Sequence, residues 1–199
     1  MKKRLLTIAA IGVAVCCLGA CKPADAGTAA DEYDDLNAML LADYSQIVLT
    51  VTNTFDEDTS LKSEYTITYS ETRITVEYSV EKFNEIDLGN PSTQLKTTLT
   101  GTVFIVNGLV VSANETDVSI SASIAQVGFT FKKNYFDNDV LSDGSFQADV
   151  KNVDSFIGSH INCSNMKIVA TFDEVFSGIT VTYISEGGNK VEIDYNFYI

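Results

Sequence analysis

The segment RITVEYSVEK, residues 73–82, shows the pattern that decides the fold. Apolar or aromatic side chains occupy every second position, at Ile74, Val76, Tyr78 and Val80. Thr, Glu and Ser residues fill the positions between them. This alternation of β-branched and aromatic residues with polar ones is typical of an antiparallel strand that buries one face.

The same alternation recurs along most of the chain. The further segments that show it are 45–55, 63–70, 96–106, 118–124, 127–131, 146–150, 167–172, 179–183 and 191–197. Turn sequences such as Asn107-Gly108 and Gly187-Gly188 separate several of them and are typical of short hairpins. The sequence therefore predicts about nine or ten antiparallel strands, with consecutive strands side by side in a meander.

Residues 31–44, before the first strand, predict the one N-terminal helix. Leu36, Met39 and Leu40 recur at helical spacing, and acidic residues crowd the first turn, where they suit the helix dipole. A short helical turn is also expected at residues 154–159. We expect residues 31–199 to form a single, mostly β domain.

A meander of this length tends to curl, close into a barrel or split into two sheets. A curved meander with one helix resembles the half-barrel lipid carriers of bacterial envelopes, the lipoprotein-carrier (LolA-like) type. In those proteins the concave apolar face holds acyl chains and a helix plugs the opening. The resemblance is one of architecture, and it implies a half-barrel. A closed barrel and a two-sheet β-sandwich are the alternatives.

Residues 1–20 have the features of an export signal peptide. A basic head, residues 1–4, precedes an apolar run of about 14 residues, which is short of the ~20 that a spanning helix needs. Leu18-Gly19-Ala20-Cys21 then resembles the lipobox of bacterial lipoproteins. The resemblance implies cleavage before Cys21 and a diacylglyceryl group on its sulfur. The alternatives are an ordinary secreted protein or an N-terminal membrane anchor.

The predicted mature chain would begin with a lipidated tether, residues 21–30, which contains no large apolar side chain after Cys21. Two acyl chains hold a protein stably at a bilayer, whereas one holds it only marginally. We expect a lipid-anchored protein of the cell envelope. Lys22 after the lipid cysteine favours the outer membrane in a two-membrane cell, by the family's sorting tendency. Cys163 would be the one thiol left in the folded domain.

Charge limits the classes of partner. The formal net charge is −14, and loss of the three basic residues in 1–20 would bring it to −17. Such a charge repels nucleic acid and anionic lipid headgroups. The expected partners are the membrane, through the acyl anchor, and an apolar small molecule. No cofactor is expected beyond the covalent acyl lipid.

Metal and catalytic sites are weakly indicated. The acidic segment 137–144 does not follow the spacing of an EF-hand loop, so we expect a solvated turn without a metal, with a weak Ca²⁺ site as the alternative. His160 is the one histidine, and Asp154, Ser155, Ser159 and Cys163 lie close to it in sequence, so a Ser/His/Asp or a Cys/His arrangement is conceivable. No nucleophile-elbow motif surrounds them. The prediction is a protein that is not an enzyme, with a hydrolase-type activity around His160 as the alternative.

Aromatic residues on the predicted buried faces are the remaining feature. They either line a site for an apolar or lipid-like ligand or fill an ordinary closed core. The leading hypothesis is ligand binding on the concave face; the alternative is a cell-envelope or surface protein-interaction module with a filled core. The candidate ligand-facing aromatics are Tyr65, Tyr69, Tyr78, Phe129, Phe131, Tyr183 and Tyr195.

Overall fold

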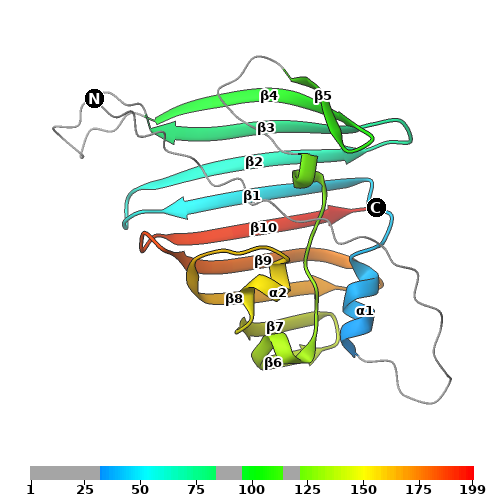
Figure 1. Ribbon diagram of the computed structural model, residues 1–199, viewed down its shortest axis with the longest axis vertical. Coiled ribbons are helices and arrows are strands. Elements are labelled where there is room, and N and C mark those ends of the chain that lie inside the picture. Colours follow the sequence, from blue (N-terminus) through cyan, green and yellow to red (C-terminus); the bar gives the residue numbers. More distant parts are fainter. Residues whose placement is uncertain (1–31, 84–95, 114–121) are drawn as a thin grey trace.

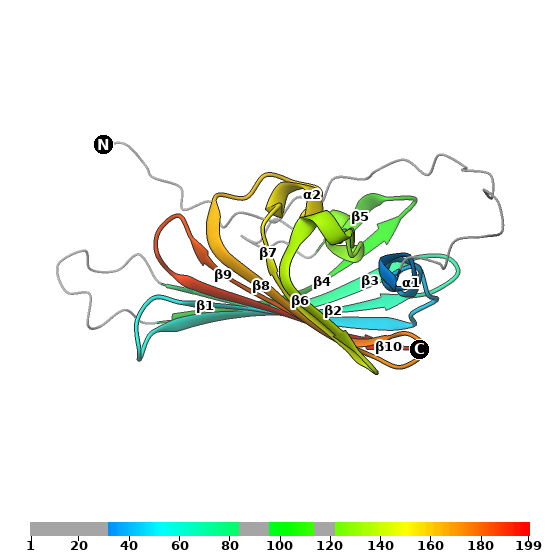
Figure 2. The same ribbon diagram turned by 90° about the horizontal axis from the view of Figure 1, so that it is seen from below.

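The computed structural model describes residues 32–83, 96–113 and 122–199, which contain one antiparallel sheet of ten strands. Figures 1 and 2 show that this sheet is curved and open. The strands are β1 (Gln46–Thr54), β2 (Ser60–Tyr69), β3 (Ile74–Phe83), β4 (Lys96–Val106), β5 (Leu109–Ala113), β6 (Phe136–Ser142), β7 (Ser145–Val150), β8 (Cys163–Phe172), β9 (Phe176–Ser185) and β10 (Lys190–Tyr198).

Four short helices accompany the sheet within the described residues. They are α1 (Glu32–Met39), α2 (Val153–Ile157) and two 3₁₀ helices, η2 (Ala122–Ala125) and η3 (Lys133–Tyr135). The predicted mostly β, curved antiparallel meander with an N-terminal helix is confirmed. Among the described residues, all strands belong to one sheet, which does not match the two-sheet alternative.

The strand order is β5-β4-β3-β2-β1-β10-β9-β8-β7-β6, so the first and last strands pair at the centre of the sheet. Ile47 of β1 lies opposite Phe197 of β10. Each half is therefore a meander, and β5 and β6, consecutive in the chain, lie at opposite edges. The described part of their connection, residues 122–135, lies on the concave side together with α1 and α2 (Figure 2).

Two predicted strands, 118–124 and 127–131, fall in this connection; the described part of the first and the whole of the second are wrong. Residues 122–125 form η2, while the rest of the predicted strand 118–124 lies outside the described residues. Residues 127–131 have no strand assignment. The segment crosses the face of the sheet, where no strand edge is available for pairing. Its alternation instead places one side against the core, where Phe131 is buried.

The acidic segment 137–144 was predicted to be a solvated turn, and this prediction is also wrong for most of its length. Residues 137–142 belong to the edge strand β6, and the pairing with β7 shifts register between Asp137 and Val140. Asn138 sits in this bulge with φ 52°. Charged residues and bulges are common on edge strands because they discourage pairing with another chain.

The N-terminal helix is shorter than predicted. It ends at Met39 instead of residue 44, and residue 31 lies outside the described range. The Tyr44 hydroxyl donates to the Met39 carbonyl oxygen at 2.8 Å and accepts from the Phe176 backbone N–H at 3.1 Å. These two bonds fix the turn that leads from α1 into β1. The short helical turn predicted at 154–159 is α2.

Candidate functional site on the concave face

The concave face brings the predicted aromatic residues together. Tyr195, Leu49, Tyr65 and Tyr78 occupy one row of paired positions across β10, β1, β2 and β3. The alternation of side chains along a strand puts Tyr69 of β2 and Tyr183 of β9 on the same face. Phe129 and Phe131 reach this face from the crossing segment, residues 122–135.

The half of the concave face formed by β6–β9 is filled by phenylalanines. Phe131 contacts four of them, with ring-centroid distances of 6.0 Å to Phe136, 5.6 Å to Phe146, 5.8 Å to Phe156 and 5.9 Å to Phe176. All five rings are almost completely buried. They come from β6, β7, β9, α2 and the crossing segment. This cluster therefore joins the sheet to the cover, which consists of α1, α2 and the crossing segment.

Hydrogen bonds hold the crossing segment in place. Asn37 of α1 forms two bonds with the backbone of Phe131: Oδ1 accepts from the N–H and Nδ2 donates to the carbonyl oxygen, both at 2.8 Å. The Tyr69 hydroxyl donates to the Ala125 carbonyl oxygen at 2.6 Å. Thr130 N–H donates to the Phe156 carbonyl oxygen at 2.8 Å. These bonds replace the strand pairing that the segment lacks.

The role of Asn37 was not predicted from the sequence. Its signal was a polar residue on the helix face that also carries Tyr33 and Leu36, the two buried residues of α1. An amide side chain on the buried face of a helix needs a hydrogen-bond partner. The partner here, the backbone of Phe131, is 94 residues away in sequence. Only the folded topology identifies it.

The other half of the concave face is lined by tyrosines. The Tyr78 ring lies over Gly101 of β4, so closely that a Cβ at Gly101 would come within 2.3 Å of the Tyr78 hydroxyl. That hydroxyl is buried and has no hydrogen-bond partner among the described residues. Burial raises the pKa of Tyr69 to about 12 and also raises the pKa of Tyr65, chiefly because the phenolate would lose its hydration. These hydroxyls therefore stay protonated at neutral pH.

One small apolar pocket lies between the cover and the sheet. Its walls include Phe129, Met166, Tyr183 and Tyr195, and it holds about 20 Å³. Phe129 meets the Tyr195 ring edge-on at 5.3 Å and stacks on Phe156 at 5.0 Å. Such a volume accommodates about one water molecule, whereas sites for small-molecule ligands usually measure about 300–1,000 Å³.

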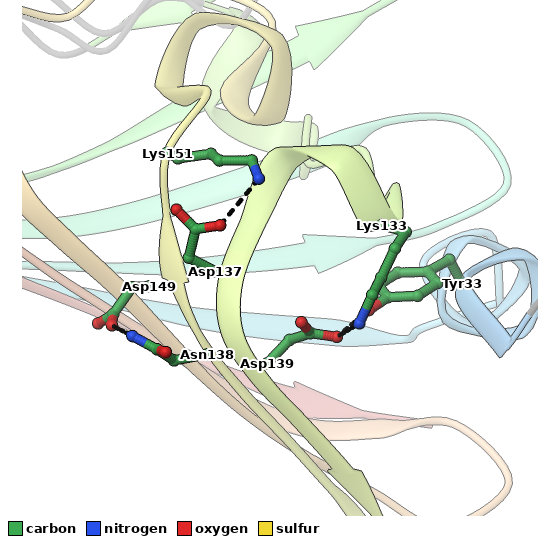
Figure 3. Close-up of polar contacts among 7 residues, drawn as sticks. All are labelled: Tyr33, Lys133, Asp137, Asn138, Asp139, Asp149 and Lys151. Carbon is green, nitrogen blue, oxygen red and sulfur yellow. Dashed lines mark hydrogen bonds and ion pairs between the residues drawn. The ribbon is translucent and has the colours of Figure 1, made fainter.

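A polar cluster fastens the edge strand β6 to its surroundings (Figure 3). The Tyr33 hydroxyl of α1 and the Lys133 ammonium both donate to Asp139 Oδ2. These contacts lower the pKa of the Asp139 carboxyl, whereas burial, with a smaller contribution from that carboxylate, raises the pKa of Tyr33 to about 12. The Asp139 cluster thus attaches α1 to the sheet edge.

Two further polar contacts in Figure 3 lie within the β6–β7 region. Lys151 pairs with Asp137 at 2.8 Å, and the Asn138 amide donates to Asp149 at 2.8 Å. Among the described residues no group of three or more His, Cys, Asp or Glu side chains could hold a metal ion. These contacts hold the edge strand β6 against β7 and the residue that follows it.

The predicted alternative of catalysis around His160 gains little from the geometry. His160 Nδ1 lies 2.8 Å from Asp154 Oδ2, and 73% of the histidine side chain is exposed. Hydrogen bonding to the carboxylate raises the pKa of His160. Burial and, less strongly, the charge of Asp154 raise the pKa of Cys163, which disfavours the reactive thiolate.

The opposite, polar face has a shallow open hollow of about 460 Å³. Threonines 50, 52, 171 and 180 line it together with Lys62 and Asp194. Gly178, between Thr171 and Asn196 in the paired strands, leaves the floor without a side chain. One acceptor of Asp194 is already used by the Thr180 hydroxyl at 2.7 Å.

Comparisons with known proteins leave the family open. No family model matches the chain, and no curated protein matches it. One solved structure that is similar is a dehydratase domain from the CurF module of curacin polyketide synthase. It is 7% identical, with 82% of this chain and 78% of that chain covered and a TM-score of 0.21. A score this low supports no argument about fold or function.

The signal peptide, Cys21 and the tether lie outside the described residues and remain predictions. Within the described part of the chain, no helix has the length and apolar character needed to span a bilayer.

Proposed function

We propose that the protein is a lipid-anchored domain of the bacterial cell envelope that acts by binding a partner with its outer surface and not by catalysis. The observation that supports this most is the filled concave face. The phenylalanine cluster around Phe131 and the cover above it occupy the space that a half-barrel ligand would need. The anchor rests on the lipobox-like Leu18-Gly19-Ala20-Cys21.

A second candidate is the binding of an apolar or lipid-like ligand beneath the crossing segment. Residues 127–131 are held by side-chain contacts and isolated hydrogen bonds, without strand pairing. The pocket under Phe129 is apolar and lies next to Tyr183 and Tyr195. If the segment moved away from the sheet, these aromatic side chains would line a larger site.

A fluorescent fatty acid distinguishes the two candidates. The filled-face proposal expects no saturable binding to the mature protein at micromolar probe. Saturable binding that is reduced by Tyr195→Ala and unaffected by the exposed control Val140→Ser would favour the second candidate and contradict the first.

The anchor has a separate test. Cys21→Ser should abolish incorporation of labelled acyl chains and leave an uncleaved precursor, while Cys163→Ser should leave both unchanged. Normal cleavage and release of the Cys21→Ser protein would contradict lipid anchoring.

A further inference from the structure

We propose that the β4–β5 hairpin is a second membrane contact, which inserts its apolar tip into the interface of the bilayer that holds the lipid anchor. This inference rests on the proposed anchoring at Cys21. It concerns Leu109, Val110 and Val111 of β5 and the neighbouring Arg73. The occupant of this surface is the apolar layer just beneath zwitterionic lipid headgroups, which carry a phosphate but no net charge.

The exposure of these side chains is the first observation. Leu109 is 68% exposed, Val110 43% and Val111 58%, so three consecutive aliphatic residues are exposed. They belong to β5, which forms one edge of the sheet (Figure 1). A single exposed leucine is ordinary, but consecutive ones mark an interaction surface. The glycine turn Asn107-Gly108 places them at a hairpin tip, where they can enter a bilayer without unfolding a strand.

The charge around the hairpin is the second observation. Residues 88–114 contain no acidic residue and one basic residue, Lys96, in a chain whose net charge is −14. No other stretch of this length lacks an acidic residue. An acidic protein is repelled by anionic headgroups and loses hydration when it approaches any bilayer. The hairpin itself, residues 96–113, contributes no carboxylate that must lose hydration, whereas Glu77 and Glu81 belong to the neighbouring strand β3 and Glu81 pairs with Lys96 at 3.7 Å.

Arg73 provides the third observation. It lies in the turn between β2 and β3, and its guanidinium carbon is 4.6 Å from the centroid of the Phe104 ring of β4. Ile74 pairs with Ile105, so Arg73 lies opposite Val106, and Val106 in turn pairs with Leu109. Arg73 is therefore two strand spacings, roughly 10 Å, from Leu109. An arginine at this position can rest its stem on the apolar surface and extend its charge to a lipid phosphate. Glu71 is the one acidic residue of the same turn, residues 70–73.

The reach of the predicted tether fits this arrangement. Eleven peptide steps separate Cys21 from Glu32, which limits their separation to about 40 Å. The domain therefore stays near the bilayer at all times, so a weak apolar contact forms at a high effective concentration.

The chain contains no tryptophan, so the fluorescence of one introduced tryptophan reports on that position alone. The mature protein with Leu109→Trp is compared with Val169→Trp, a matched control at an aliphatic position of β8 that is 47% exposed. Each is added to phosphatidylcholine vesicles with plain or brominated acyl chains. Mass measurement confirms the acyl group on Cys21 beforehand.

We expect the Leu109→Trp emission to shift to shorter wavelength and to be quenched by brominated chains at least threefold more than that of Val169→Trp. Adding Val111→Asp to Leu109→Trp should at least halve the quenching. Equal quenching at both positions would overturn the proposal. A shift that depends on protein concentration without vesicles would also overturn it, since that result indicates a second copy as the occupant. Because acylation is measured separately, either failure leaves the anchor at Cys21 standing.

Discussion

The two halves of the concave face solve the same packing problem with different aromatic residues. Over β6–β9, phenylalanines from four segments pack around Phe131, and their side chains bring no polar atom into the cluster. Over β1–β4, tyrosines bring hydroxyl groups that each require a partner. Tyr69 has one in the Ala125 carbonyl, while Tyr78 has none among the described residues. We infer that the phenylalanine half contributes more to the free energy of unfolding. The polar groups of the tyrosine half are less completely hydrogen-bonded.

Removal of one ring from the phenylalanine half should have the largest effect. Phe146→Ala leaves a cavity at a position with no exposed surface and should lower the free energy of unfolding by about 3–5 kcal/mol. Tyr65→Ala on the other half should lower it less, because Tyr65 is only partly buried. Urea unfolding followed by circular dichroism measures both. Equal losses would remove the distinction between the halves.

Removal of the two hydrogen bonds between Asn37 of α1 and the Phe131 backbone should have the next largest effect on stability. Asn37→Ala leaves the N–H and the carbonyl of Phe131 without their partners, which should cost about 2 kcal/mol. Asn37→Asp keeps the acceptor and should lose less. A loss below that of an average surface substitution would show that the segment is held by apolar contacts alone.

Two tyrosine-to-phenylalanine substitutions should act in opposite directions. Tyr69→Phe removes the donor to Ala125 and should lower the free energy of unfolding by about 1 kcal/mol. Tyr78→Phe removes a buried hydroxyl without a described partner and should leave stability unchanged or raise it by up to about 1 kcal/mol. Thermal unfolding of the pair measures the signs. A marked destabilisation by Tyr78→Phe would mean that its hydroxyl is satisfied.

The polar cluster at the β6 edge should have the smallest effect. The hydrogen bonds from Lys133 and Tyr33 hold the pKa of Asp139 below 3.8 in the folded protein. The stabilisation is therefore complete above about pH 5 and is lost progressively as the pH falls through the lowered pKa. The stability difference between wild type and Asp139→Asn should be small at pH 7, as for other ion pairs in contact with solvent. It should shrink below pH 4; a difference that grows there would contradict the assignment.

The sequence predicts the strands well where alternation and pairing coincide, and the range 96–106 is identical to that of β4. It fails at residues 127–131, because alternation arises equally from a strand in a ladder and from an unpaired segment packed on a sheet. It fails at β6, because Asp137, Asn138 and Asp139 are poor strand formers that an edge tolerates. The aromatic face follows from the side-chain period of two. Asn37 and Asp139 acquire their roles from contacts across about 100 residues, which local patterns do not encode.

Native mass spectrometry of the mature protein, purified without detergent from the cells that process it, tests the filled concave face most directly. The filled face predicts the mass of the polypeptide plus covalent acyl groups and nothing else. After organic extraction, no apolar molecule should be recovered in proportion to protein. One non-covalent lipid-like molecule per chain, lost when Tyr195→Ala is introduced, would contradict the account.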